Sequence, residues 1–228
     1  MDPTRLILVR HGESNVTVEG RFGGEQACTG LSPLGRQQAE RLRDRFAAGQ
    51  EPAVDEVWSS QLPRAYETAE IVNAAIGHPV QIDPGLEEFR PGAVDGMRFA
   101  DYVEQYGRPD QLADPYRYVA EGGDSRASFF LRIGETFDHL LSERSGRSIA
   151  VFCHGGVVDA VFRQLLGIAG EAPFQLHTAN TAITEFVTTD HGPPRRWRLV
   201  RYNDSAHLAG LPAATPPAPS TPASDEGD

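Results

Sequence analysis

The stretch Leu6-Ile7-Leu8-Val9-Arg10-His11-Gly12-Glu13 is an apolar run that ends abruptly at a cation, an imidazole and a glycine. Four consecutive apolar residues followed by a polar break are typical of a buried β-strand. A second apolar run, Ile149-Ala150-Val151-Phe152-Cys153, ends in the same way at His154-Gly155-Gly156. We therefore expect two histidines at the ends of strands, each followed by glycine.

The rest of the chain alternates strand and helix patterns around these two runs. Strands are predicted at residues 55–60, 80–82, 183–188 and 197–202, and helices at residues 33–46, 62–76, 125–141 and 157–166. Ser32 followed by Pro33 is a favourable helix start, because serine caps the helix and proline fits its first turn. This alternation predicts a three-layer α/β/α sandwich with a mostly parallel central sheet and active residues at the carboxyl ends of its strands.

The domain organisation follows from length and from local composition. A chain of 228 residues can bury one sizeable core, so we expect a single domain over residues 1–210. Within it, glycines and prolines interrupt residues 89–123, which we interpret as a lid or substrate loop. Residues 211–228 are rich in Ala, Pro, Ser and Thr and end in acidic residues, which predicts a disordered tail.

Charge and composition restrict the classes of function. The net charge is −11 and the isoelectric point is about 5.1, so no nucleic acid or anionic membrane partner is expected, and an anionic substrate must be bound locally. All 21 basic residues are arginine, which rules out lysine Schiff bases and suits bidentate phosphate recognition. Two cysteines support neither a disulfide framework nor a cysteine-ligated zinc site. With no signal peptide or transmembrane pattern, a cytoplasmic protein is expected.

Val9-Arg10-His11-Gly12-Glu13-Ser14 closely resembles the signature of the histidine phosphatase superfamily, also called the phosphoglycerate mutase-like family. Further stretches match the blocks of this family in order, namely residues 31–39, 59–69, 86–88, 153–157 and 180–181, so the resemblance spans roughly residues 5–209. It implies a phosphoglycerate mutase-like fold and a catalytic domain over residues 1–210. It also implies a metal-independent phosphomonoesterase that hydrolyses a small phosphorylated metabolite through phosphohistidine, without a cofactor.

The residues themselves suit this chemistry. Attack on phosphorus needs a neutral imidazole nitrogen and a nearby cation, and His11 beside Arg10 offers both, although an isolated histidine more often has a packing role. The resemblance implies that His11 is the residue that becomes phosphorylated. Arg64 opens a helix after a strand and is expected to bind the phosphate, the alternative being a solvated arginine. His154 and the Gly155 amide are expected at the same site, again at a helix start.

Two positions are less sharply defined. A carboxylic acid is needed to protonate the leaving oxygen, and the neighbours Glu87 and Glu88 compete for this role. The spacing to Gly92 and Gly96 aligns Glu88 with the acid of the family, which leaves Glu87 as a solvated loop carboxylate. Arg21 matches a frequently basic position and is expected to extend the phosphate pocket. The other histidines lack ligand spacing, so no metal site is predicted.

Two alternatives stay open beside the phosphatase. A phosphoglycerate-type mutase would need extra cations for a second anion, whereas the arginines between residues 88 and 154 alternate with acidic residues and form no long basic insertion. A non-catalytic phospho-ligand module would be expected to lose the nucleophile or the acid. The natural substrate is open, and so is the oligomeric state, for which a homodimer is one candidate.

Overall fold

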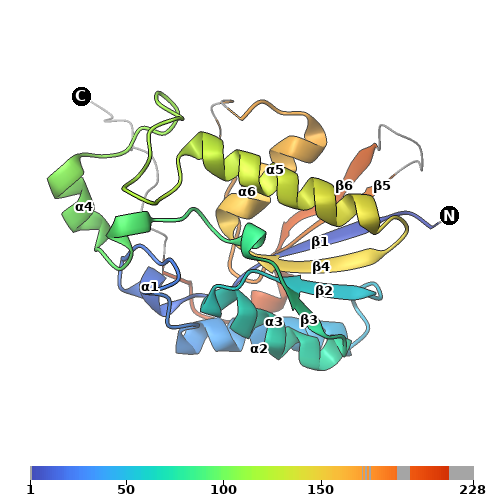
Figure 1. Cartoon of the computed structure of the whole chain (residues 1–228). Coiled ribbons are helices and arrows are strands. Elements are labelled where there is room, and N and C mark those ends of the chain that lie inside the picture. The colour runs from blue at the N-terminus through green and yellow to red at the C-terminus, as the bar shows by residue number, and fades with distance from the viewer. Residues whose placement is uncertain (1, 171, 173, 175, 189–195, 216–228) are drawn as a thin grey trace, which may run out of the picture.

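Six strands form one mixed sheet at the centre of the computed structural model, which describes residues 2–170, 172, 174, 176–188 and 196–215 (Figure 1). The strands are β1 (Arg5–Arg10), β2 (Glu56–Ser59), β3 (Val80–Ile82), β4 (Ser148–Cys153), β5 (Ile183–Thr188) and β6 (Trp197–Asp204), in the order β3-β2-β4-β1-β5-β6. Strands β3, β2, β4 and β1 are parallel, and β5 is antiparallel to both β1 and β6. The predicted mostly parallel sheet is confirmed.

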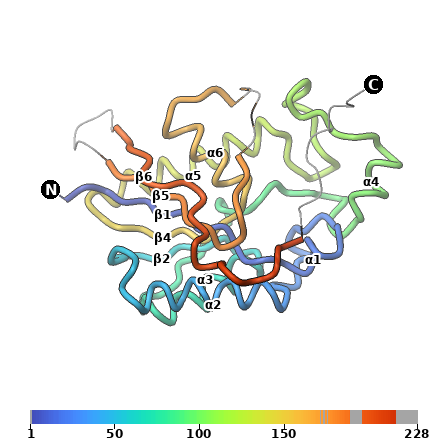
Figure 2. Tube along the Cα trace, turned by 180° about the vertical axis from the view of Figure 1, so that it is seen from behind, coloured from blue at the N-terminus to red at the C-terminus, as the bar shows by residue number. Residues whose placement is uncertain are grey.

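Helices cover both faces of this sheet. Helices α2 (Pro33–Ala47) and α3 (Pro63–Ile76) lie on one face, and α5 (Arg126–Glu143) and α6 (Gly155–Leu166) lie on the other, an arrangement that Figures 1 and 2 show from opposite sides. Successive side chains of a strand point to opposite faces. Leu6 and Leu8 accordingly pack with α5 and α6, whereas Ile7 and Val9 pack with α2 and α3. Burial on both faces explains why the strand is apolar throughout.

The register of β1 and β4 sets the position of the two histidines. Arg10 lies opposite Cys153 at the end of the parallel pair. The next residue of each strand is a histidine, so His11 and His154 emerge side by side at the carboxyl edge of the sheet.

Capping residues set the starts and ends of the helices where the sequence predicts them. Ser32 caps α2 by accepting the Gly35 N–H, and Ser125 forms a capping box with Ser128 at the start of α5. Gly77 ends α3 with a φ of 86°, which favours glycine.

The segment 89–123 is more ordered than its composition suggests. It contains α4 (Phe99–Tyr106), which lies beyond the carboxyl ends of the strands in Figure 1 and which the sequence analysis did not predict. Tyr102 makes ring contacts with Phe22, Phe99 and Tyr106, so an aromatic cluster stabilises this short helix. A second short helix, α1 (Asn15–Val18), follows the first histidine and was also not predicted.

The C-terminal end of the described chain turns back toward the first histidine. Within the predicted tail, the Thr215 N–H donates to Glu13 Oε2 (2.6 Å). Residues 216–228 of that predicted tail lie outside the described residues. Among the helices of the described ranges, none combines the length and the apolar character needed to cross a bilayer.

Candidate active site

The main chain and the ring of His11 are held by hydrogen bonds. Its N–H donates to the Cys153 carbonyl (2.9 Å), and its carbonyl accepts from Asn180 Nδ2 (2.9 Å). Ring atom Nδ1 lies 2.6 Å from the Gly12 carbonyl oxygen, which can only accept, so Nδ1 carries the proton. The other nitrogen, Nε2, therefore has a free lone pair, and Arg64 Nε–H donates to it (3.2 Å).

His154 lies beside this nucleophile candidate, with its ring centroid 5.1 Å from that of His11. Ser60 Oγ accepts the Leu62 N–H, so its own O–H is left to donate a hydrogen bond to His154 Nε2 (2.9 Å). The proton of the neutral imidazole then lies on Nδ1, which is buried without a hydrogen-bond partner in the described chain. His154 thus has a spare donor at the site.

Two guanidinium groups and a helix start complete what we call the phosphate cup, formed by Arg10, His11, Arg64, His154 and Gly155. Arg64, in the first turn of α3, is 5% exposed and also donates from Nη1 to the Gly23 carbonyl (2.7 Å). Arg10 donates from Nη1 to the Thr178 carbonyl, and its buried Nε has no partner among the described residues. Gly155 begins α6, and a Cβ there would lie 3.7 Å from Arg10 Nε.

Both imidazoles of the cup are neutral at neutral pH. Burial lowers the pKa of His11 well below its usual 6.5, and the positive charges of Arg64 and Arg10 lower it further. Burial also lowers the pKa of His154, with Arg64 as the next cause. The positive charge of the cup therefore comes from the two guanidinium groups, which match the charge of a phosphate dianion.

Glu88 approaches the cup from the segment after β3. Its Oε2 accepts the Gly156 N–H (2.9 Å), and its Oε1 accepts the Phe89 N–H (3.0 Å). A Cβ at position 156 would overlap this carboxylate, so glycine is required for its approach. Burial lowers the pKa of Arg10, and the negative charge of Glu88 opposes that effect.

Two adjacent histidines and two arginines at one sheet edge agree with the family match of the chain. The model of the histidine phosphatase superfamily (branch 1) matches residues 6–205. The chain belongs to this family.

Individual relatives of this histidine phosphatase act on small phosphorylated metabolites. A glucosyl-3-phosphoglycerate phosphatase of Mycolicibacterium vanbaalenii is 31% identical over 222 residues, covering 90% of this chain and 96% of the relative. A metal-independent phosphoserine phosphatase of Arabidopsis thaliana is 25% identical over 214 residues, covering 91% and 84%. The solved phosphoserine phosphatase of Entamoeba histolytica with 3-phosphoglyceric acid has a TM-score of 0.74 at 25% identity, covering 90% and 99%. The expected phosphoglycerate mutase-like fold is confirmed.

The prediction that Glu87 is a solvated loop carboxylate is wrong. Its side chain is buried at 1% exposure, and Glu87 Oε2 lies 2.6 Å from Arg90 Nε. Gln61 Nε2 donates to its other oxygen. The chain is extended at this position, so the two neighbouring glutamates point to different sides: Glu88 toward α6 and Glu87 toward Gln61.

The side chain of Arg21, which is expected to extend the phosphate pocket, bonds to the segment 89–123. Its Nη1 donates to the Gly96 carbonyl (2.7 Å), and its Nε lies 3.1 Å from Glu19 Oε2. These bonds join the loop after α1 to the segment that carries α4.

Several residues that hold the cup in this histidine phosphatase had no assigned role in the sequence analysis. Thr68 Oγ1 accepts the Gly12 N–H (3.0 Å) and donates to the Arg64 carbonyl (2.7 Å), so it joins the loop that follows β1 to the first turn of α3. Asn180 and Ser60 hold His11 and His154 as described above. All three lie in matched sequence blocks, and their signal is a polar residue buried next to a strand end or on an apolar helix face.

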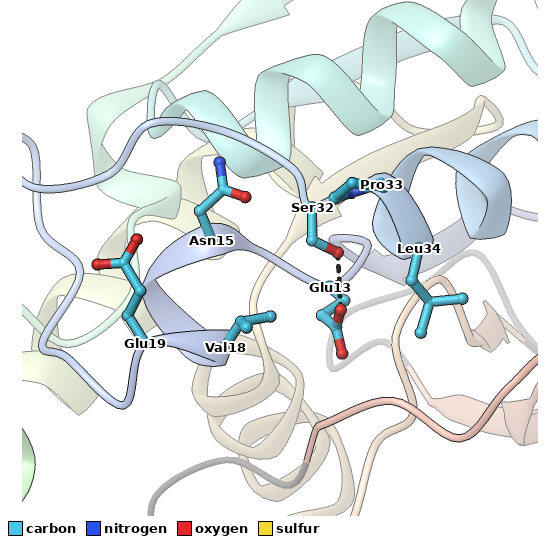
Figure 3. Close-up of a pocket in the computed structure, with 7 residues that line it drawn as sticks. All are labelled: Glu13, Asn15, Val18, Glu19, Ser32, Pro33 and Leu34. Atoms are coloured by element: carbon cyan, nitrogen blue, oxygen red, sulfur yellow. Dashed lines mark hydrogen bonds between the residues drawn. The ribbon is translucent and has the colours of Figure 1, made fainter.

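A separate surface pocket of about 340 Å³ lies beside the loop that follows His11 (Figure 3). Its lining residues are Glu13, Asn15, Val18, Glu19, Ser32, Pro33 and Leu34, and none belongs to the phosphate cup. Ser32 Oγ donates to Glu13 Oε1 there (2.7 Å), and this bond joins the start of α2 to the loop that follows His11. No cluster of three His, Cys, Asp or Glu side chains suited to a metal occurs among the residues that the structure describes.

Proposed function

We propose that this histidine phosphatase is a phosphomonoesterase that cleaves a small phosphorylated metabolite through a phosphohistidine intermediate. The observation that carries the proposal is the unprotonated Nε2 of His11, which lies in a buried cup beside two guanidinium groups. A dianionic phosphate is attracted to such a cup, and a neutral imidazole can attack its phosphorus.

Binding would use the donors that the cup presents. The phosphate oxygens accept from Arg10, Arg64, the Nδ1–H of His154 and the Gly155 N–H, so the buried polar atoms of Arg10 and His154 gain partners. The start of α6 adds a favourable dipole for an anion. This clamp holds the phosphoryl group in line with His11, and positioning of this kind supplies much of the catalysis in phosphoryl transfer.

In the first step, the lone pair of His11 Nε2 forms a bond to phosphorus while the bond to the leaving oxygen breaks. The carboxylic acid form of Glu88 gives its proton to that oxygen, and the product is an alcohol. The Nδ1–H of the phosphorylated ring keeps its hydrogen bond to the Gly12 carbonyl.

In the second step, water attacks phosphorus and Glu88, now a carboxylate, takes one of its protons. The bond between phosphorus and Nε2 breaks, and inorganic phosphate leaves with neutral His11 restored. Segment 89–123, which is joined to the cup loops through Arg21 and Asp95, is proposed as the part that covers the leaving group.

Hydrolysis of p-nitrophenyl phosphate by the wild type and by His11→Ala tests the function. We expect the variant to lose activity by at least about a thousandfold, because the covalent route is removed. His139→Ala is the matched control, since the side chain of this histidine is 73% exposed and lies near the end of α5, which leads to the start of β4, whereas the cup lies at the end of that strand. Quenching in alkaline detergent with substrate labelled at phosphorus should trap phosphoprotein in the wild type and in His139→Ala but not in His11→Ala, because the bond between phosphorus and the imidazole nitrogen is labile in acid.

Equal rates in His11→Ala and the wild type would contradict the proposal, as would label retained by the variant. Incubation with 3-phosphoglycerate distinguishes the mutase alternative, because a mutase would give the isomer rather than inorganic phosphate.

A further inference from the structure

Three carboxylates lie on the segments that adjoin the phosphate cup, and we call Glu25, Glu87 and Asp95 the acidic rim. Glu25 is two residues after Gly23, whose carbonyl accepts from Arg64. Glu87 directly precedes Glu88, which reaches the start of α6. Asp95 is the contribution of segment 89–123. Under the proposed function the cup holds the phosphate and segment 89–123 covers the leaving group, so Asp95 and the loop bonded to it lie on the leaving-group side.

Asp95 occupies the main-chain donors of the loop beside the cup. Its Oδ1 accepts the Gly24 N–H (2.8 Å), and its Oδ2 accepts the Gln26 N–H (2.9 Å). Loop N–H groups that converge on one point form an anion-binding nest. Here the anion in the nest is a side chain of the protein, so a second acidic group of a substrate would have to displace Asp95.

Glu25 and Glu87 add two negative charges close to each other. Gln61 Nε2 donates to both carboxylates, and contact with Glu87 raises the pKa of Glu25. Gln61 directly follows Ser60, the partner of His154. Glu25 and Glu87, which both bond to Gln61, are therefore next to a segment that holds the cup.

Three arginines that contact the segments of the acidic rim are already bound within the protein. Arg90 pairs with Glu87, and Arg21 bonds to Glu19 and to the Gly96 carbonyl. Arg132 pairs with Asp124 and donates to the carbonyls of residues 85, 87 and 88. A second anion on the substrate would therefore have to compete with protein groups for these three arginines.

We propose that the acidic rim, with Asp95 as its main specificity determinant, selects phosphate monoesters whose leaving group carries no net negative charge. Neutral polyols, neutral sugars and amino alcohols fit this description, whereas leaving groups with an uncompensated carboxylate or a second phosphate do not. The inference rests on the proposed phosphomonoesterase function, and it specifies the substrate class of the same site.

The sharpest probes are glycerol 3-phosphate and 3-phosphoglycerate, which share a three-carbon skeleton. Glycerol 3-phosphate has a neutral hydroxymethyl group at the position where 3-phosphoglycerate has a carboxylate. Their inhibition constants against p-nitrophenyl phosphate hydrolysis give a ratio whether or not either ester is turned over. In the wild type we expect glycerol 3-phosphate to bind at least about tenfold more tightly, because like charges repel near a partly buried site. High salt should reduce this ratio.

Asp95→Asn should bring the ratio closer to one, mainly by tighter binding of 3-phosphoglycerate. Glu25→Gln, at an exposed position that makes no bond to the nest, should act in the same direction and serves if Asp95→Asn disturbs the loop. Glu40→Gln on α2 removes the same unit of charge from an exposed position outside segment 89–123 and should leave the wild-type ratio unchanged.

A wild-type ratio near one, or charge-neutralised rim variants that behave like Glu40→Gln, would overturn the inference while p-nitrophenyl phosphate is still hydrolysed. Failure of the wild type to hydrolyse p-nitrophenyl phosphate would instead refute the proposed function on which it rests.

Discussion

At the scale of single residues, Glu87 and Glu88 are adjacent in sequence but differ in surroundings. Glu88 lies beside Arg10 and the start of α6, whereas Glu87 is buried against Arg90 and Gln61. We expect Glu88→Gln to slow the hydrolysis of alkyl phosphates by about a hundredfold to ten-thousandfold, because it removes the proton donor. The loss should be much smaller for p-nitrophenyl phosphate, whose leaving group is a weak base.

The companion variant Glu87→Gln should leave this dependence on the leaving group as it is in the wild type. Its main effect should be a loss of about 1–3 kcal/mol in the free energy of unfolding, because a buried hydrogen-bonded charge pair is disrupted. Steady-state rates on both esters and urea unfolding measure the two effects. If Glu87→Gln instead made the rate sensitive to the leaving group, the assignment of the acid would have to be exchanged.

The two buried imidazoles make the stability of the protein depend on pH. The pKa of His11 and that of His154 are lowered in the folded state, so below pH 6.5 the unfolded chain binds protons that the native protein does not. Stability is therefore present above pH 6.5 and falls as the pH drops, by up to about 1.4 kcal/mol per pH unit for each histidine. Between pH 7 and pH 5, the free energy of unfolding of His154→Gln, measured in urea, should decline less steeply than that of the wild type. Parallel curves would show that His154 does not contribute.

At the scale of elements, the nucleophile loop and α2 are in close main-chain contact at two glycines. A Cβ at Gly35 would overlap the Glu13 main chain, and one at Gly12 would overlap the Gly35 carbonyl. Gly35→Ala should therefore cost at least about 1–3 kcal/mol of unfolding free energy and reduce kcat, because the loop that holds His11 must shift. Gly134→Ala in α5 is the control, since its nearest neighbour is 3.9 Å away, and it should stabilise by about 0.4–1 kcal/mol. Thermal unfolding and kinetics of both variants test this contrast.

The elements also show where sequence reasoning reaches its limit. Continuous apolar runs and cap residues were sufficient for β1, β4, α2 and α5, because burial on both faces and capping are local properties. They were not sufficient for α4, which is eight residues long and depends on aromatic contacts with Phe22, distant in the sequence. The burial of Glu87 likewise depends on Gln61, 26 residues earlier, and no local pattern records that contact.

At the scale of the whole molecule, a strongly acidic protein surrounds a small positive site. The net charge is −11, whereas the cup holds two guanidinium groups and two neutral imidazoles. A divalent cation would be repelled by Arg10 and Arg64, so activity on p-nitrophenyl phosphate should be unchanged after dialysis against EDTA and should not rise with added Mg²⁺. A loss that zinc or magnesium restores would contradict this expectation.

Strand β1 ends one residue before His11, and it pairs with β4 on one side and with β5 on the other. Amides in such an interior strand exchange with deuterium mainly when the domain opens as a whole, whereas frayed edges exchange by local opening. Local opening at the edges of the sheet therefore leaves His11 Nε2 in place relative to the side chains around it. We expect heat inactivation to follow the cooperative melting of the domain rather than to precede it.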